Sequence, residues 1–222
     1  RYCKCYLDFL ISNIMKFLKE TNNILTNPDG VREKALTLDY YTNENHPTLN
    51  DGGEEWVCNV SKDISKETGV LADACIEVIN QLQRDTNEFV SEYKAFCQYT
   101  TASSRPGYVH TDQHLLGKTR GDGIAGVNYI GNVYLTPDDV QEESSWYEYY
   151  EAKYLDDTAE MGDYLKLTSD KLNDVGIRVF EYNKCLSFDS DIPHKNAPLS
   201  NNPWGTDVSD SPLCLTVFMK TS

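Results

Sequence analysis

Two of the four histidines of this 222-residue chain have neighbours that would let them bind a metal ion. His110 and Asp112 follow a Pro-Gly turn and stand two residues apart, so on a short strand both side chains point to the same face. His194 follows a predicted strand end and turn, from which a neighbouring strand would bring a second imidazole to the same place. His110, Asp112 and His194 therefore predict a metal centre with three protein ligands.

Two imidazoles and one carboxylate form the ligand set of non-haem Fe(II) oxygenases, because they leave about three coordination positions open. A structural zinc ion would instead take four protein ligands. An isolated His-x-Asp pair is most often a surface histidine hydrogen-bonded to a carboxylate. The interpretation as a metal centre therefore depends on the segments that surround the pair.

Three segments follow in a recognisable order. The segment 131–137 lies about twenty residues after the His-x-Asp pair, 182–191 leads into the second histidine, and 213–219 forms a final strand. This order resembles the 2-oxoglutarate- and Fe(II)-dependent dioxygenases of the prolyl-hydroxylase-like kind, from about Tyr93 to the end of the chain. The stretch 27–38 also resembles the amino-terminal part of uncharacterised bacterial and phage members of that group.

The resemblance implies a mainly β fold with flanking helices, a double-stranded β-helix or jelly roll like that of the cupins, with Fe(II) in its open mouth. By position, His110, Asp112 and His194 match the three iron ligands. Tyr134 matches a tyrosine whose hydroxyl bonds the distal carboxylate of 2-oxoglutarate, and Tyr99 matches an aromatic residue close to this cosubstrate. The implied enzyme uses 2-oxoglutarate and O₂ to hydroxylate a substrate C–H bond and releases succinate and CO₂.

The sequence departs from the family at one position. The family places an Arg or Lys at the start of the last strand, where it pairs with the distal carboxylate of 2-oxoglutarate, and Pro212 stands there in this chain. A proline offers neither a charge nor an N–H donor. Four basic residues lie on segments that can approach the mouth, and of these we expect Arg105 to supply the charge: Arg105, Lys118, Arg120 and Arg178. The other interpretation is that 2-oxoglutarate binds poorly or not at all.

The elements that must position these residues are predicted to form one domain, 1–222. Residues 1–85 are expected to be a mostly helical support, and 86–222 a jelly-roll core with an insertion at about 138–174. Apolar residues at helical spacing predict an amphipathic helix in the first 25 residues and another within 62–84. Asn27 and Pro28 mark the start of a short helix between them. Strands are predicted at 126–135, 176–188 and 213–220, and a helix or lid at 156–172.

Composition excludes several classes of protein. The 20 Lys and Arg against 35 Asp and Glu give a net charge of −15, which disfavours a nucleic-acid scaffold or a binder of anionic membranes. No apolar run approaches the ~20 residues of a membrane span, and without a signal-peptide pattern a cytoplasmic location is favoured. The seven scattered cysteines do not read as a disulfide framework, and four are expected to be small buried hydrophobic residues: Cys75, Cys97, Cys185 and Cys214.

Two other functions remain open from the sequence. In the first, the chain is a jelly-roll protein that binds the metal but no longer catalyses the reaction, as Pro212 suggests. In the second, it is an acidic interaction module that binds a basic partner through its Tyr-rich face around 146–154. Retention of stoichiometric Fe(II) separates the metal-binding functions from the interaction module. For an enzyme, the expected partner is an unidentified small-molecule or peptide substrate.

Overall fold

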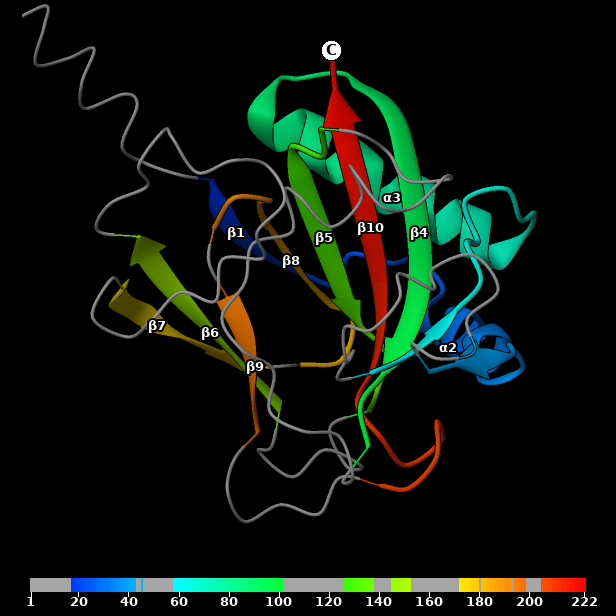
Figure 1. Cartoon of the computed structure of the whole chain (residues 1–222). Coiled ribbons are helices and arrows are strands. Elements are labelled where there is room, and N and C mark those ends of the chain that lie inside the picture. The colour runs from blue at the N-terminus through cyan, green and yellow to red at the C-terminus, as the bar shows by residue number, and fades with distance from the viewer. Residues whose placement is uncertain are drawn as a thin grey trace, which may run out of the picture.

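The computed structural model describes residues 17–42, 45, 58–101, 126–137, 145–152, 172–179, 181–192, 194–198 and 205–222. For 145–152, 172–179 and 195–198 it describes the backbone. These residues form ten strands and two helices (Figure 1). The predicted site residues Arg105, His110 and Asp112, and all but the last residue of the predicted helix or lid at 156–172, lie outside the described part of the chain.

Local sequence signals mark the start of the first helix and the end of the second. Helix α2 (Pro28–Leu36) is capped by Asn27, whose side-chain oxygen accepts a hydrogen bond from the backbone N–H of Gly30 at 3.1 Å. Helix α3 (Val70–Thr86) ends at Asn87, which adopts a left-handed conformation with φ 59°. The predicted apolar stripe of α3 is confirmed, since one face of the helix is buried: Leu71, Ala74, Cys75, Val78, Ile79 and Leu82. No helix in the described ranges has the length and apolar character needed to cross a membrane.

The strands form two antiparallel sheets. The larger sheet has the order β1 (Leu18–Asn22), β8 (Lys184–Asp189), β5 (Tyr129–Tyr134), β10 (Leu213–Thr221), β4 (Val90–Tyr99), β3 (Asn59–Ser61) and β2 (Tyr40–Tyr41). The smaller sheet has the order β7 (Leu172–Val179), β6 (Ser145–Ala152) and β9 (His194–Pro198). The final strand, β10, is central, because it pairs with β5 on one side and β4 on the other.

Two elements differ from their sequence-based predictions, and a strand lies within the predicted insertion. Residues Leu18–Asn22, at the end of the predicted first helix, form a strand that pairs along β8, while 1–16 lie outside the described residues. The predicted strand 176–188 is two strands, separated by a turn in which Asn183 has φ 56°. Strand β6 falls within the predicted insertion, yet it is the middle strand of the smaller sheet and pairs with both β7 and β9.

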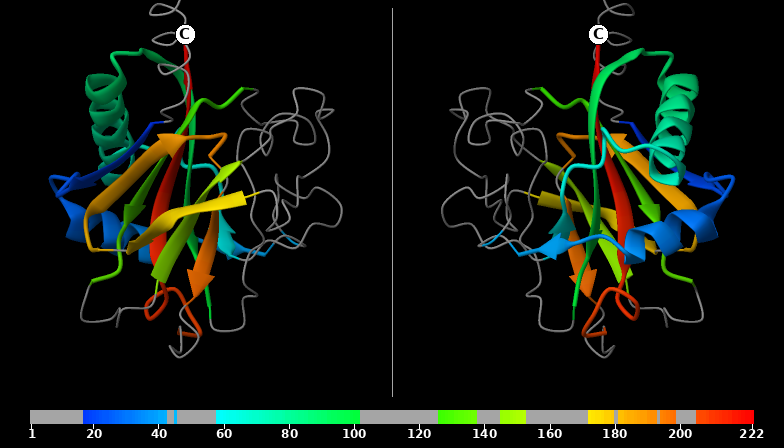
Figure 2. Two further views of the ribbon diagram at one scale, coloured as in Figure 1. Left: turned by 90° about the vertical axis from the view of Figure 1, so that its left-hand side faces the viewer. Right: turned by 90° about the vertical axis from the view of Figure 1, so that its right-hand side faces the viewer.

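The larger sheet has two buried faces, because side chains alternate along each strand. Its outer face packs under α3 through residues such as Val133, Leu215 and Val217, and Figure 2 shows the helix along this side. Its inner face carries a second apolar cluster: Val127, Ile130, Tyr134, Leu186, Phe188, Ile192 and Cys214. The smaller sheet meets this inner side, where the ring of Phe188 contacts that of His194 on β9. Burial on both faces explains why nearly every side chain of β8 is buried and why β10 is mostly apolar from Leu213 to Met219.

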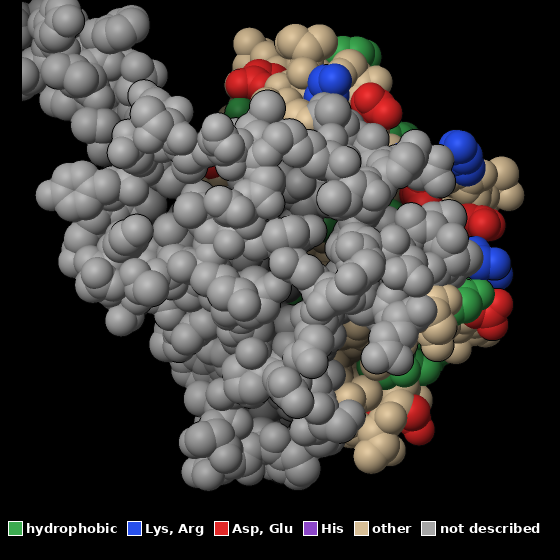
Figure 3. Space-filling model, viewed as in Figure 1, with side chains coloured by type: hydrophobic (Ala, Val, Ile, Leu, Met, Phe, Trp, Pro, Cys, Tyr) green, Lys and Arg blue, Asp and Glu red, His purple; other side chains and the backbone are tan. Residues whose placement is uncertain are grey.

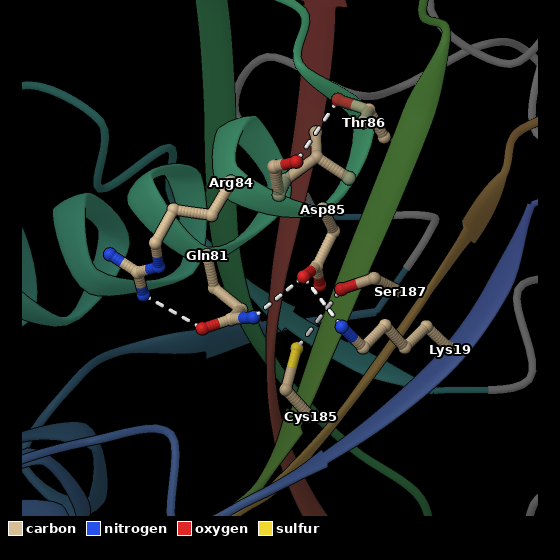
Figure 4. Close-up of polar contacts among 8 residues, drawn as sticks. Lys19, Gln81, Arg84, Asp85, Thr86, Cys185 and Ser187 are labelled. Carbon is tan, nitrogen blue, oxygen red and sulfur yellow. Dashed lines mark hydrogen bonds and ion pairs between the residues drawn. The ribbon is translucent and has the colours of Figure 1, made fainter.

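Side-chain contacts tie the edge strand β1 to this core. Figure 4 shows Lys19 of β1 reaching Asp85 at the end of α3, with 2.6 Å between the Lys19 Nζ and the Asp85 Oδ1. The same oxygen accepts a hydrogen bond from the Gln81 Nε2 at 2.9 Å. After β1, both backbone polar groups of Leu25 bond the side-chain amide of Asn183, at 2.9 and 3.0 Å. The amino-terminal segment is therefore fastened to both α3 and the turn before β8.

Replacing Gly131 with alanine is expected to lower the free energy of unfolding by about 1–3 kcal/mol, the range for overpacking a core. A Cβ at this position would come within 2.6 Å of the Val78 Cγ1 on α3, closer than side chains pack. Chemical denaturation measures the effect. The double variant with Val78→Ala should recover part of the loss, because it removes the clashing methyl group, and strict additivity of the two changes would contradict this packing.

Candidate metal and cosubstrate site

His194 is buried, and the backbone orients its ring. It is the first residue of β9 and is 3% exposed, with its ring 5.0 Å from that of Phe188 in an edge-on arrangement. The His194 Nδ1 lies 3.0 Å from the backbone carbonyl oxygen of Ile192. A carbonyl only accepts hydrogen bonds, so Nδ1 carries the proton of this contact, and in a neutral ring the lone pair is then on Nε2. A backbone carbonyl that orients the ring in this way is a usual partner of a metal ligand.

The turn before β9 is held by hydrogen bonds to neighbouring strands. The Ser190 Oγ donates to the carbonyl of Val127 at 2.6 Å, and the Ser190 N–H donates to the carbonyl of Asn128 at 2.8 Å. The Ile192 N–H closes the turn on the carbonyl of Asp189 at 3.0 Å. The carbonyl that orients His194 is therefore itself fixed by the sheet.

Tyr134 lies on the inner face, as the predicted cosubstrate role requires. It is the last residue of β5, is 2% exposed and pairs with Cys214 on β10. Its backbone carbonyl accepts a hydrogen bond from the Asn183 N–H at 2.9 Å, which holds this strand end against β8. Burial raises the pKa of the neighbouring Cys214 thiol, so this thiol stays protonated and neutral at neutral pH.

The structure does not bring Tyr99 to the same face. Tyr99 pairs with Leu213, which belongs to the helix-covered core, and its ring packs edge-on against Tyr40 with centroids 4.9 Å apart. Burial, and to a smaller extent the charge of Asp207, raises the pKa of Tyr99. We therefore leave Tyr99 out of the site that we propose below.

Pro212 stands directly before β10, at the strand start where the sequence comparison expects a basic residue. Its carbonyl accepts a hydrogen bond from the Thr100 N–H at 3.3 Å, so the segment is joined to the end of β4. The chain thus places no charge at this position. Within the described residues no three His, Cys, Asp or Glu side chains gather into a metal site, and His110, Asp112 and Arg105 stay predictions.

The sequence analysis did not single out a group of neutral polar side chains on the inner face. The Gln98 Nε2 of β4 donates to the Thr216 Oγ1 of β10 at 2.8 Å, and Thr216 pairs with Asn132 of β5. Asn132 is 3% exposed. The alternation of side chains along β5 could have indicated this group from the sequence, because Asn132 stands at an inward position between Ile130 and Tyr134.

The prediction for the four core cysteines is confirmed. Cys75, Cys97, Cys185 and Cys214 are free and buried. Burial raises the pKa of Cys75 and of Cys185 to about 12. These thiols therefore act as small apolar side chains rather than as nucleophiles at neutral pH.

Comparisons with known proteins find likeness in structure and none in sequence. No protein-family model matches the chain, and no curated protein matches it. The non-heme alpha ketoglutarate dependent epimerase SnoN, from nogalamycin biosynthesis, superimposes with a TM-score of 0.60 at 10% identity, over 97% of this chain and 84% of SnoN.

Two further solved structures agree. HygX from Streptomyces hygroscopicus, with nickel, 2-oxoglutarate and hygromycin B bound, gives a TM-score of 0.56 at 14% identity, over 95% of this chain and 85% of HygX. A Pseudomonas putida prolyl-4-hydroxylase gives 0.52 at 11% identity, over 98% of this chain and all of that one. At such identities the likeness concerns the fold. This chain therefore has the double-stranded β-helix, or jelly-roll, fold found in 2-oxoglutarate-dependent oxygenases.

Proposed function

We propose that the protein is a non-haem Fe(II)- and 2-oxoglutarate-dependent dioxygenase that hydroxylates a C–H bond of a small-molecule or peptide substrate. The metal ligands would be His110, Asp112 and His194. The observation that carries the proposal is His194, a buried imidazole at the start of β9 whose hydrogen bond to Ile192 selects the metal-binding tautomer. The shared fold supports the same reaction class.

The described residues His194, Phe188, Ile192 and Tyr134 support this proposal in different ways. The bonded Nδ1 of His194 keeps the ring oriented and leaves Nε2 as the nitrogen that would hold Fe(II). Phe188, which is 0% exposed and has its ring 5.0 Å from the imidazole, shields that side of His194 from water. Tyr134 would donate its hydroxyl proton to the distal carboxylate of the cosubstrate. Fe(II) with 2-oxoglutarate and O₂ supplies the oxidising power, and succinate and CO₂ are released.

Anaerobic titration of the Fe(II)-loaded protein with 2-oxoglutarate tests the proposal. A weak visible metal-to-ligand charge-transfer band is expected as the 2-oxo acid chelates the iron. Iron binding without this band would favour the metal-binding protein that lacks turnover, which Pro212 makes a specific alternative. Failure to retain iron would refute the metal centre itself.

The acidic interaction module, which would bind a basic partner through its Tyr-rich face around 146–154, stays a second candidate, because the structure does not describe the side chains of that face. On the side of the molecule that carries α2 and α3, acidic and basic side chains of the described residues are interspersed (Figure 3). Such mixing keeps a protein soluble without building an extended field of one sign.

Tyr134→Phe is expected to weaken 2-oxoglutarate binding by about 1.5–3 kcal/mol, the usual contribution of a hydrogen bond to a charged group. The iron content should not change, because the substitution leaves the metal ligands in place. The charge-transfer titration measures both quantities. Equal affinity of Tyr134→Phe and the wild type would contradict the assigned role of the hydroxyl.

A further inference from the structure

One end of the inner face is marked by Tyr134 and Pro212, the two positions that the proposed function links to the far carboxylate of 2-oxoglutarate. Tyr134 pairs with Cys214, and Pro212 stands two residues before Cys214, so strand alternation gives both Cys214 and Pro212 an inward position. Phe188 lies in the same apolar cluster as Tyr134 and contacts the ring of His194. The face therefore runs from the candidate metal ligand to the place of the far carboxylate.

The side chains along this face are mainly apolar. The Cys214 thiol is neutral at neutral pH, because burial raises its pKa. An apolar ligand group gains free energy by burial against such a lining, whereas a carboxylate loses its hydration there. The apolar lining consists of Ile130, Leu186, Cys214, Phe96 and Phe218.

The polar side chains of the face do not compensate a carboxylate. The Gln98 Nε2 already donates to the Thr216 Oγ1 at 2.8 Å. Asn132 is 3% exposed, and its Oδ1 has no hydrogen-bond partner among the residues that the structure describes. This oxygen only accepts hydrogen bonds, as a carboxylate does, so the two would repel each other.

The lysines of the larger sheet do not supply a charge at this place either. The Lys94 Nζ lies 2.6 Å from Asp63, and the Lys184 Nζ lies 3.2 Å from Glu20, so both ammonium groups are paired with carboxylates. Lys220 shares the inward alternation of β10 but stands roughly 26 Å from the start of that strand. In the part of the chain that the structure describes, no unpaired positive charge therefore meets the far end of a 2-oxo acid.

We propose that the 2-oxo acid site of this protein accepts acids with an uncharged, apolar tail at least as well as 2-oxoglutarate. The inference rests on the proposed function, which supplies the metal centre and the chelating 2-oxo acid. Specificity between two ligands is the difference between their binding free energies. A basic residue at the position of Pro212 would favour the charged tail, whereas burial against Ile130 and Leu186 favours the apolar one.

Anaerobic titration of the Fe(II)-loaded wild type with two acids tests the inference. The first is 2-oxoglutarate, and the second is 5-methyl-2-oxohexanoate, in which an isopropyl group of similar shape replaces the far carboxylate. Both should give the weak visible charge-transfer band, and the dissociation constant of the apolar acid should be equal or lower. A preference for 2-oxoglutarate of more than about tenfold would overturn the inference, because it would show a hydrogen bond with a charged partner, such as Arg105.

Pro212→Arg should reverse the selectivity. The variant places a guanidinium at the inward position before β10, so 2-oxoglutarate should bind about 10- to 100-fold more tightly, while the apolar acid gains nothing. Pro212→Met is the matched control, because it adds a long side chain without a charge and should keep the wild-type selectivity. Melting temperatures show that both variants are folded. Unchanged selectivity in folded Pro212→Arg would overturn the inference, because Pro212 would then not face the tail.

The same titrations separate this inference from the proposed function. A band with 2-oxoglutarate alone would overturn the inference and leave the proposed function intact. Iron binding without a band for either acid would overturn both.

Discussion

Replacing His194 with alanine is expected to lower the affinity for Fe(II) by more than about 100-fold, since removing only an outer partner of a metal ligand costs about 10- to 100-fold. The domain should stay folded, because the contacts described for His194, the hydrogen bond to the Ile192 carbonyl and the ring contact with Phe188, are a small part of the core. Iron content after anaerobic loading and desalting measures the first effect. Circular dichroism and thermal unfolding of the metal-free protein measure the second.

Two other histidines and the aspartate provide the comparisons. His110→Ala and Asp112→Ala should lose iron as His194→Ala does, because all three complete one ligand set. His46→Ala removes a histidine outside the predicted ligand set, whose neighbours Glu44, Asn45 and Pro47 are typical of a polar loop, so the iron content of this variant should equal that of the wild type. Stoichiometric iron in any of the first three variants would remove that residue from the metal centre.

Replacing Phe188 with alanine is expected to lower the free energy of unfolding by about 3–5 kcal/mol, the usual cost of emptying a buried aromatic position. Phe188 is 0% exposed, sits in the inner apolar cluster and packs its ring on His194. The lost ring also leaves the imidazole less restrained, so iron affinity should fall as well. Urea denaturation of the metal-free protein gives the stability, and metal titration gives the affinity.

Phe89→Ala controls for removal of an aromatic side chain in general. Phe89 is 67% exposed, so its loss should change stability by less than about 0.5 kcal/mol. Phe188→Leu, which keeps most of the buried apolar volume, should cost clearly less than Phe188→Ala. A cost for Phe188→Ala as small as that for Phe89→Ala would contradict the packing between the two sheets.

The two substitutions separate the metal centre from the core beneath it. His194→Ala should remove iron at a small cost in stability, whereas Phe188→Ala should reduce both. If His194→Ala unfolded the domain instead, the buried imidazole would have a structural role in joining β9 to the larger sheet. Thermal unfolding of the metal-free variants distinguishes these outcomes, because stabilisation by bound iron does not enter the comparison.

Elements whose signals are local were predictable from the sequence alone. The start of α2 depends on an Asn27 cap and a proline at the first helical position, and the buried stripe of α3 repeats every three to four residues. The final strand was predicted at 213–220 and is found at Leu213–Thr221. Each of these signals acts within one or two turns of helix or along one strand, so no distant partner was needed to read it.

Elements that depend on a distant partner were not predictable. Residues Leu18–Asn22 stand at the end of an apolar pattern with helical spacing. They nevertheless form a strand, because they pair with the edge of β8, more than 160 residues later in the chain. Strand β6 likewise acquires its place from β7 and β9. Local propensity contains no information on the pairing partner, although a strand gains most of its stability from its neighbours.

The sequence by itself determined the residue types on which the site depends: an imidazole after the turn that follows β8, a tyrosine at the end of β5 and a proline before β10. Only the tertiary structure decided which of them share a face. Register places Tyr134 and Cys214 inward but Tyr99 and Leu213 under the helices, and a shift by one residue would exchange the two sets. It also directed the side chain of Asn132 inward through the pairing of β5 with β8, and it held the turn that carries the Ile192 carbonyl through the hydrogen bond from Ser190 to Val127.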